Sequence, residues 1–209
     1  YGRIPSLIVT LGMLNIARGG ALLLSNGLPI SISERTVSNA NVRNFLFLGQ
    51  GKLFSIVPMM VVFLIVIAFG GYFFFHKTII GYHMKAVGGN RYAARASGIN
   101  VKKIKIISFV VTGFLCGISG ILNLSFLANV QGTVGTGLEL DTIAAVIIGG
   151  TSLIGGQGTI IGTIIGVLII GILRNGLVLL GVSPFWQILL MGVIIIGAIG
   201  IDMWTRKKE

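Results

Sequence analysis

The sequence predicts an all-α polytopic membrane protein, and two observations lead to that fold class. Of the 209 residues, 54% are hydrophobic and only 10% are charged, and the mean hydropathy is +0.98, whereas a soluble domain carries about 25% charged residues. The hydrophobic residues form long continuous runs without the alternation typical of outer-membrane β-strands. Because lipid offers the backbone no hydrogen-bond partners, these runs must form helices. We expect about five full transmembrane helices, one short buried helix and one short cytoplasmic helix.

Five hydrophobic runs approach the length of about 20 residues that a helix needs to cross a bilayer. They cover residues 7–24, 57–75, 106–128, 159–180 and 186–204. Two of them carry glycines at helical spacing, which predicts close contact with neighbouring helices. These are Gly113, Gly117 and Gly120 in the third run, and Gly158, Gly162 and Gly166 at the start of the fourth.

A further hydrophobic segment, residues 141–154, is too short to cross the ~30 Å hydrocarbon core at about 1.5 Å per residue. It follows a glycine-rich loop, residues 129–140. We expect a short helix buried among the others, with Asp141 as its N-cap and an end at Gly149 and Gly150. Broken helices of this kind need surrounding protein or a water-filled cavity, and they often line transport paths.

The segment Gly81–Lys105 is polar and basic, contains no acidic residue and separates two hydrophobic runs. Within it we predict a short helix, because Asn90 is a favourable N-cap, alanines favour helix, and Gly98 permits a left-handed stop. This helix is compatible with two interpretations. The segment is either a cytoplasmic connection that only obeys the positive-inside rule, or a docking element for a soluble partner.

The distribution of lysine and arginine predicts the orientation of the chain. Residues 76–105 and the tail 206–208 are the most basic segments, so both are expected in the cytoplasm. Counting the spans from 81–105 also brings the tail to the cytoplasm, provided that the short segment counts as a crossing. Residues 25–56, 129–140 and 181–185 then face outward. The net charge of +11 comes mainly from residues 76–105 and 206–208, where the positive-inside rule already predicts it, so it does not indicate a nucleic-acid partner.

The sequence contains no catalytic constellation and no metal-ligand spacing, so we predict neither an enzyme nor a metal site. Gly51 and Lys52 do not form a phosphate-binding loop. Such a loop needs a glycine where Leu46 stands and a serine or threonine where Leu53 stands. If the protein uses ATP, a separate protein must bind it.

Polar residues that flank the short segment and the following span are candidates for a translocation path or gate. These are Glu139, Asp141, Thr142, Arg174 and Asn175. For the two carboxylates the alternative is stabilisation of a helix N-terminus. For Arg174 it is extension of the side chain to the outer head groups.

Several stretches resemble the permeases of ABC-type sugar importers, in the branch that serves ribose, xylose, galactose and similar compounds. Residues 86–100, AVGGNRYAARASGIN, resemble that family's cytoplasmic coupling segment, and residues 135–156 resemble its second signature. Residues 8–13, 17–19, 175–177 and 183–187 fit as well. The resemblance covers nearly the whole chain, although the family's N-terminal spans are absent and residues 25–56 are not diagnostic.

The resemblance implies that residues 1–209 form one transmembrane permease domain, the C-terminal part of a longer permease of the bacterial inner membrane. Two permease copies would form one path, two ATPase subunits would dock on the cytoplasmic side, and a sugar-binding protein would dock outside. ATP and Mg²⁺ would be bound by the ATPase subunits, and the permease itself would hold no cofactor. Transport would follow alternating access, driven through segment 81–105.

The residues assigned to ATPase coupling by this resemblance lie at the centre of segment 81–105. They are Gly88, Gly89, Asn90, Arg91, Ala93, Ala94, Arg95, Ser97 and Gly98. The small side chains of Ala93, Ala94 and Ser97 are expected to let a partner approach the backbone. Arg91 and Arg95, one turn apart, are expected to share a face.

Two other classes of function remain compatible with the residues themselves. One is an ion-coupled secondary transporter of a small polar solute, and the other is a membrane scaffold that transports nothing. A coupled carrier usually buries ionisable groups in its spans. This chain has only five acidic residues, which argues against a self-powered carrier.

Overall fold

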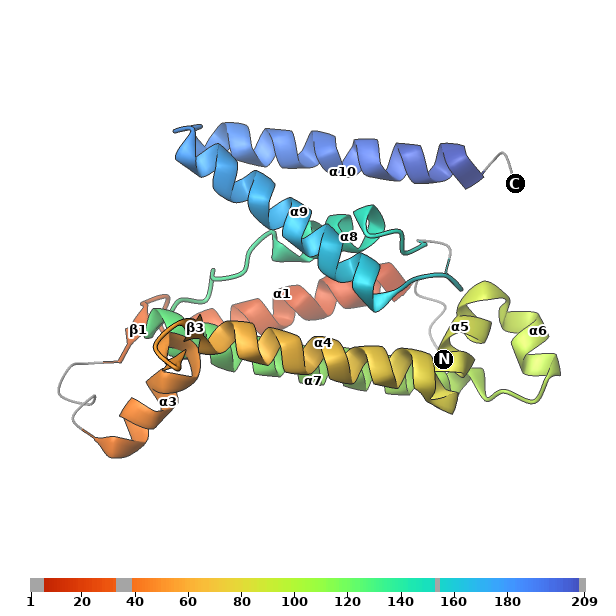
Figure 1. Ribbon diagram of the computed structural model, residues 1–209, viewed down its shortest axis with the longest axis horizontal. Helices are drawn as coiled ribbons and strands as arrows, with labels where there is room; N and C mark the ends of the chain where they lie inside the picture. Colours follow the sequence, from red (N-terminus) through yellow and green to blue (C-terminus); the bar gives the residue numbers. More distant parts are fainter. Residues whose placement is uncertain (1–5, 33–38, 153–154, 207–209) are drawn as a thin grey trace. The chain divides into compact units, whose positions relative to one another are not determined.

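The computed structural model is largely helical, and it describes residues 6–32, 39–152 and 155–206 (Figure 1). The helices are α1 (Ser6–Leu24), α3 (Ala40–Gln50), α4 (Met59–Lys77), α5 (Ile79–Gly89), α6 (Arg91–Ala96), α7 (Val101–Leu127), α8 (Leu138–Ile148), α9 (Ile160–Leu179) and α10 (Pro184–Arg206). Within these described ranges, four two-residue strands form two antiparallel pairs, β1 (Ile30–Ser31) with β4 (Asn129–Val130) and β2 (Lys52–Leu53) with β3 (Val57–Pro58).

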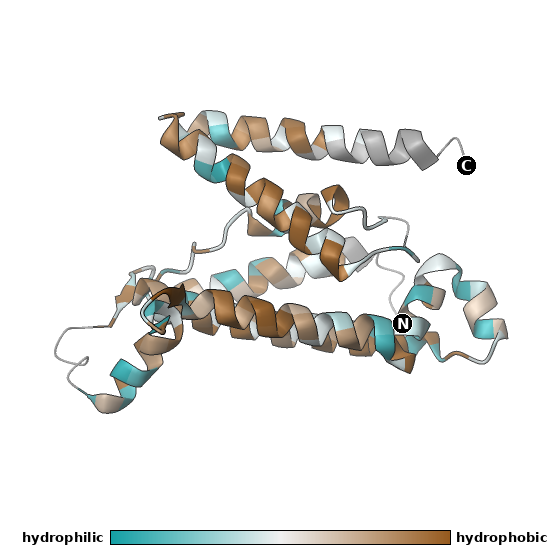
Figure 2. Cartoon of the chain, viewed as in Figure 1, coloured by the Kyte–Doolittle hydropathy of each residue, from teal (hydrophilic) through white to brown (hydrophobic). Residues whose placement is uncertain are grey.

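Three helices of the described part of the chain, α4, α7 and α9, are long and hydrophobic enough to cross a membrane. Figure 2 shows the hydrophobic colouring along α4 and α9 and the hydrophilic residues on α5 and α6. The predicted first and last spans correspond to α1 and α10, in which the stretches Ile8–Leu24 and Pro184–Ile194 are hydrophobic. A largely helical membrane protein is therefore confirmed, whereas the predicted number of full spans is not.

The short segment forms a helix of 11 residues, α8, which is about 16 Å long and cannot span a bilayer alone. Its predicted N-cap is wrong. The helix begins at Leu138, after Gly137 in a left-handed conformation with φ of 87°, so Asp141 lies within the first turn. The helix ends at Ile148, and residues 153 and 154 of the predicted segment lie outside the described residues.

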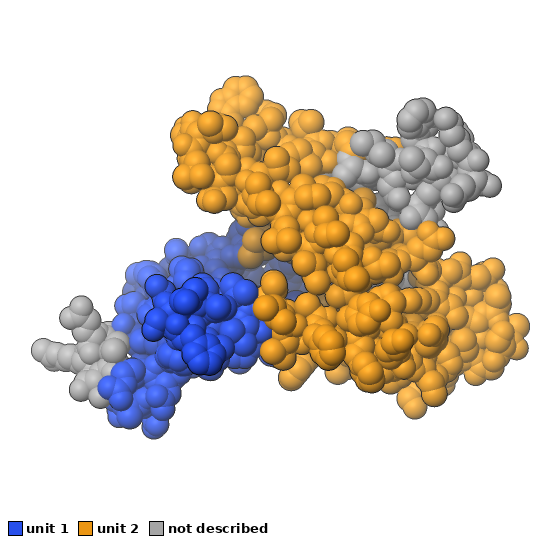
Figure 3. Space-filling view, viewed as in Figure 1, with its two compact units in different colours: residues 1–63, 115–136 blue, residues 64–114, 137–209 orange. Residues whose placement is uncertain are grey.

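The chain divides into two compact units, residues 1–63 with 115–136 and residues 64–114 with 137–209 (Figure 3). In the first unit, the buried hydroxyl of Ser125 on α7 holds α3 in place. It accepts a hydrogen bond from the Gly49 amide at 2.7 Å and donates one to the Phe45 carbonyl at 2.6 Å. A helix thus stands within residues 25–56, where the sequence predicted a loop.

In the second unit, α8 and α9 touch backbone to backbone. A Cβ atom at Gly166 would collide with the carbonyl oxygen of Ala145, and one at Gly162 would collide with that of Gly149. The close contact predicted from the glycines of this span is confirmed at these two positions. By contrast, a Cβ at Gly113, Gly117 or Gly120 would meet nothing within 4 Å among the described residues.

Helix α10 packs on the α8–α9 pair through a small hydrophobic cluster. Ala144 and Ala145 of α8, Ile170 of α9 and Met191 of α10 are all buried in it. The two alanines expose 0% and 2% of their surface, because the close helix contact leaves no room for larger side chains. The short helix is therefore held by its neighbours, as a broken membrane helix must be.

The α8–α9 contact predicts that Gly166→Ala destabilises the protein. The new methyl group would overlap a backbone carbonyl, and overpacking of this kind costs about 1–3 kcal/mol. The change is measurable as the free energy of unfolding of the purified protein in mixed micelles titrated with sodium dodecyl sulfate.

Gly171→Ala is the matched control for that substitution. It lies on the same helix, and its Cβ would meet none of the described atoms within 4 Å. The free energy of unfolding of this variant should stay within about 0.5 kcal/mol of the original protein. Equal losses in the two variants would contradict the assigned helix contact.

Candidate functional site

The predicted short helix exists as α6, with the predicted start and stop. The Asn90 side-chain oxygen accepts hydrogen bonds from the Tyr92 and Ala93 amides, both at 3.0 Å. The helix ends at Ala96, and Gly98 follows with φ of 82°. The Ser97 hydroxyl donates to the Ala93 carbonyl at 3.0 Å, so that hydroxyl is already used within the helix.

Helix α6 rests on a helix that the sequence analysis missed. Thr78 caps α5, because its hydroxyl oxygen accepts a hydrogen bond from the Gly81 amide at 3.2 Å. The signal was present in the sequence, since Ile80, Met84 and Val87 recur at helical spacing after a capping threonine. The basic composition of residues 81–105 favoured a loop as the interpretation instead.

A buried cluster joins α6 to α5 and to the start of α7. Its members are Val87, Ala94 and Ile104, each no more than 6% exposed. The interpretation of Ala94 as a residue that lets a partner approach is therefore wrong. Its methyl group packs inside the chain, and its small size lets α6 lie close to α5.

The outer side of α6 is basic and aromatic. Arg91 and Arg95 line one depression together with Lys102, and its volume is about 740 Å³. Both arginines thus lie beside the same depression. Tyr92, which the sequence analysis did not single out, is 89% exposed beside them. An aromatic ring between two arginines on a polar helix is a signal that could have identified it.

The start of α7 contributes to this basic surface. The helix begins at Val101 rather than at residue 106. The Asn100 side-chain oxygen accepts a hydrogen bond from the Lys103 amide at 3.1 Å. The lysines after it therefore stand on helical turns rather than in a loop, and their positions are fixed relative to α6 through the buried cluster.

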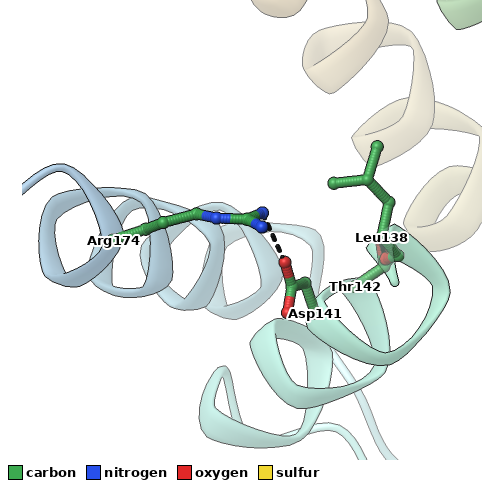
Figure 4. Close-up of polar contacts among 4 residues, drawn as sticks. All are labelled: Leu138, Asp141, Thr142 and Arg174. Atoms are coloured by element: carbon green, nitrogen blue, oxygen red, sulfur yellow. Dashed lines mark hydrogen bonds and ion pairs between the residues drawn. The ribbon is translucent and has the colours of Figure 1, made fainter. Parts of the chain in front are cut away.

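The candidate gate residues are brought together only in part. Arg174 of α9 forms an ion pair with Asp141 of α8, with 2.7 Å between Nη1 and Oδ2 (Figure 4). Thr142 donates its hydroxyl hydrogen to the Leu138 carbonyl at 2.6 Å. Glu139 and Asn175 are exposed, and within the described part of the chain neither is hydrogen-bonded to this pair.

The ion pair links the short helix to its neighbouring long helix. A charge-assisted hydrogen bond of this length is stronger than a neutral one, and the Asp141 side chain is only 16% exposed while that of Arg174 is 50% exposed. Asp141 also lies in the first turn of α8, where a negative charge is favoured by the helix dipole. Asp141 thus combines helix stabilisation with a contact to α9.

The long hydrophobic helices, the short helix packed against two of its neighbours and the basic helix pair define a multi-pass membrane protein. Residues 1–199 match the family described as the permease component of the branched-chain amino acid transport system, and the chain belongs to this family. No solved structure matches the chain.

Three curated relatives are similar to nearly the whole chain. The ribose import permease protein RbsC of Escherichia coli (strain K12) is 42% identical over 208 residues, which are 100% of this chain and 62% of that protein. RbsC of Bacillus subtilis (strain 168) is 41% identical over 212 residues, 100% of this chain and 62% of that protein. The L-arabinose ABC transporter permease protein AraH of Azospirillum brasilense is 38% identical over 207 residues, 99% of this chain and 58% of that protein. The chain thus spans about three fifths of the length of these relatives.

The ion pair predicts energetic coupling between Asp141 and Arg174. In a double-mutant cycle with Asp141→Asn and Arg174→Gln, the two effects on the free energy of unfolding should fall short of additivity by about 0.5–1 kcal/mol, because half of the Arg174 side chain is exposed.

Glu139→Gln provides the control cycle. Glu139 is an exposed carboxylate on the same helix, and its change should add to that of Arg174→Gln without coupling. A coupling energy of similar size in both cycles would show that the effect is general electrostatics and not the observed contact.

Proposed function

We propose that this chain forms part of the permease subunit of an ABC importer that moves a monosaccharide across the bacterial inner membrane. Its substrate would be ribose or a related pentose or hexose, and ATP hydrolysis would take place in separate ATPase subunits. The permease would then be a transport subunit rather than an enzyme. The observation that carries the proposal is α6, a capped basic helix held on a hydrophobic base with its arginines and Tyr92 outside.

The proposed topology uses α1, α4, α7, α9 and α10 as the five spans and α8 as a short helix between them. The basic elements α5 and α6 and the C-terminus would lie in the cytoplasm, in accord with the positive-inside rule. The predicted basic tail contributes to this assignment, although residues 207 and 208 lie outside the described residues. Helix α3 and the β1–β4 pair would then lie on the outer side.

The proposed partners follow from this topology. Two ATPase subunits, which would hold ATP and Mg²⁺, would receive α6, and a sugar-binding protein would dock on the outer segments. A second permease copy would complete the path. Gly113, Gly117 and Gly120 of α7 would offer a smooth face for close contact with a helix of that copy.

In α6 the proposed coupling residues divide by position. Arg91, Tyr92, Ala93 and Arg95 are exposed and would contact the ATPase. Ala94 is buried and would hold the helix in place. Asn90 and Gly98 would set its start and end. On the other side of the path, the Asp141–Arg174 pair would serve as a gate that fixes α8 on α9.

The names of the relatives support a substrate class rather than one sugar. Two of them are named for ribose and one for arabinose, although their sequences are similarly close to this chain. We therefore propose that selection among sugars rests mainly with the sugar-binding protein.

Uptake into vesicles tests the proposed function directly. The full-length permease, reconstituted with its ATPase subunits and sugar-binding protein, should accumulate labelled ribose only when ATP is present on the ATPase side. Omitting the ATPase should abolish accumulation. Accumulation without ATPase, driven by an ion gradient, would instead identify an ion-coupled secondary transporter.

Exposed and buried positions on α6 should respond differently to substitution. Tyr92→Ala should weaken association with the ATPase about tenfold or more, since exposed aromatic residues often dominate interfaces, and should leave permease stability unchanged. Association is measured by binding of the purified ATPase to permease in nanodiscs. Phe185→Ala, which removes an 83% exposed ring at the start of α10, should leave association intact.

The neighbouring alanines provide a second pair of variants. Ala93→Trp adds bulk on the exposed side of α6 and should block the ATPase without loss of stability. Ala94→Trp places the same ring in the buried cluster and should lower the free energy of unfolding by about 1–3 kcal/mol or more. Identical behaviour of the two variants would contradict the assigned orientation of α6.

A further inference from the structure

Four glycines bring the end of α5 into backbone contact with the loop between α8 and α9. We call this the glycine contact, and it consists of Gly88, Gly89, Gly155 and Gly156. A Cβ at Gly88 would lie 2.6 Å from the Gly156 amide nitrogen, and one at Gly156 would lie 2.7 Å from the Gly89 Cα. A Cβ at Gly155 would lie 2.7 Å from the Gly88 carbonyl oxygen. Gly88, Gly155 and Gly156 therefore have no room for a side chain, whereas a Cβ at Gly89 would lie 3.8 Å from the Gly156 Cα, an ordinary contact distance.

The α5 side of the contact is rigid. Helix α5 and helix α6 share the buried cluster of Val87, Ala94 and Ile104. Gly88 directly follows Val87 in α5, and Asn90, the cap of α6, follows Gly89. A displacement of α6 must therefore move the α5 glycines with it.

The loop side is fixed by hydrogen bonds. The Ser152 amide donates to the Gln157 carbonyl at 3.0 Å, and the Gly155 amide donates to the Ser152 hydroxyl at 3.3 Å. Thr159 caps α9, because its hydroxyl oxygen accepts a hydrogen bond from the Gly162 amide at 3.0 Å. The loop thus leads directly into the start of α9.

The loop glycines belong to the same packed body as the candidate gate. Helix α9 touches α8 through Gly162 and Gly166, and the Asp141–Arg174 ion pair joins the two helices further along. Packed helices shift as units rather than deform. A displacement of the loop should therefore move both α8 and α9.

Beside the glycine contact, α5 is separated from α8 and α9. A pocket of about 310 Å³ separates Met84 and Lys85 of α5 from Val146 of α8 and Thr163 of α9. Backbone atoms touch at the glycines while side chains leave space next to them. This geometry is suited to a pivot. The backbone contact at the glycines can transmit a displacement of α5, and the pocket leaves space for α5 to rotate relative to α8 and α9.

We propose that the glycine contact transmits the movement of α6 to α8 and α9, so that the Asp141–Arg174 pair shifts when the ATPase moves. The proposal rests on the proposed function, in which α6 is the element that docks on the ATPase. It assigns Gly156 as a positioning residue, which acts on the path through α8 and α9 without touching substrate or nucleotide.

The pair Gly156→Ala and Gly150→Ala tests this role. The two glycines have similar left-handed φ values, 81° and 83°, so alanine strains the backbone equally. They differ in contact, because a Cβ at Gly150 meets nothing within 4 Å among the described residues. A difference between the two variants in sugar transported per ATP hydrolysed therefore measures the effect of the contact with α5.

Both variants are assayed in the full-length permease assembled with its ATPase subunits and sugar-binding protein in vesicles. Gly156→Ala should bind the ATPase normally and hydrolyse ATP, while sugar transported per ATP hydrolysed falls at least about fivefold. Gly150→Ala should keep the original ratio. A merely structural role of Gly156 would lower assembly and hydrolysis together and leave the ratio unchanged, which would overturn the proposal, as would equal ratios in the two variants.

Amide hydrogen exchange of the original complex tests the proposal without any substitution. Addition of ATP should change the protection of residues 155–158 together with that of residues 88–98. A change confined to residues 88–98 would overturn the pivot and leave the proposed function intact. Uptake by the original protein without ATPase would overturn both.

Discussion

The close approach of α8 to α9 is the contact on which the rest of the second unit depends. A helix of 11 residues leaves its ends within the depth of a bilayer, where unsatisfied backbone groups are costly. Gly162 and Gly166 let the backbone of α8 lie directly on α9, and the cluster with Met191 encloses it from α10. The short helix is thereby stabilised by packing against its neighbours and not by its own length.

The same principle of small residues at close contacts recurs where the basic helices join the hydrophobic part of the unit. Ala94 lets α6 fold against α5, and the four glycines let α5 meet the loop before α9. A side chain at either place would separate the elements and introduce a flexible connection. Backbone contacts are short and stiff, which suits the proposed transmission of movement from α6 to α8 and α9.

Charge has a different role from packing in this molecule. Arg91 and Arg95 of α6 and Lys102 at the start of α7 line one depression. The positive-inside rule alone would account for their presence but not for their fixed arrangement. Capping by Asn90 and Asn100 and the buried cluster beneath set that arrangement, and this order is what makes the surface suitable for a partner.

Features that depend on local chemistry could be predicted from the sequence. The hydrophobic runs identified a helical membrane protein, Asn90 and Gly98 marked the ends of α6, and the glycines at 162 and 166 marked a close helix contact. The residues that meet across long distances in the chain became known only from the packing of the helices. It paired Asp141 with Arg174 instead of using Asp141 as a cap, buried Ala94 and exposed Tyr92, placed α3 against Ser125, and brought Gly88 to Gly156. Periodicity shows that a helix has two faces, but the neighbours that cover one of them are known only once the chain has packed.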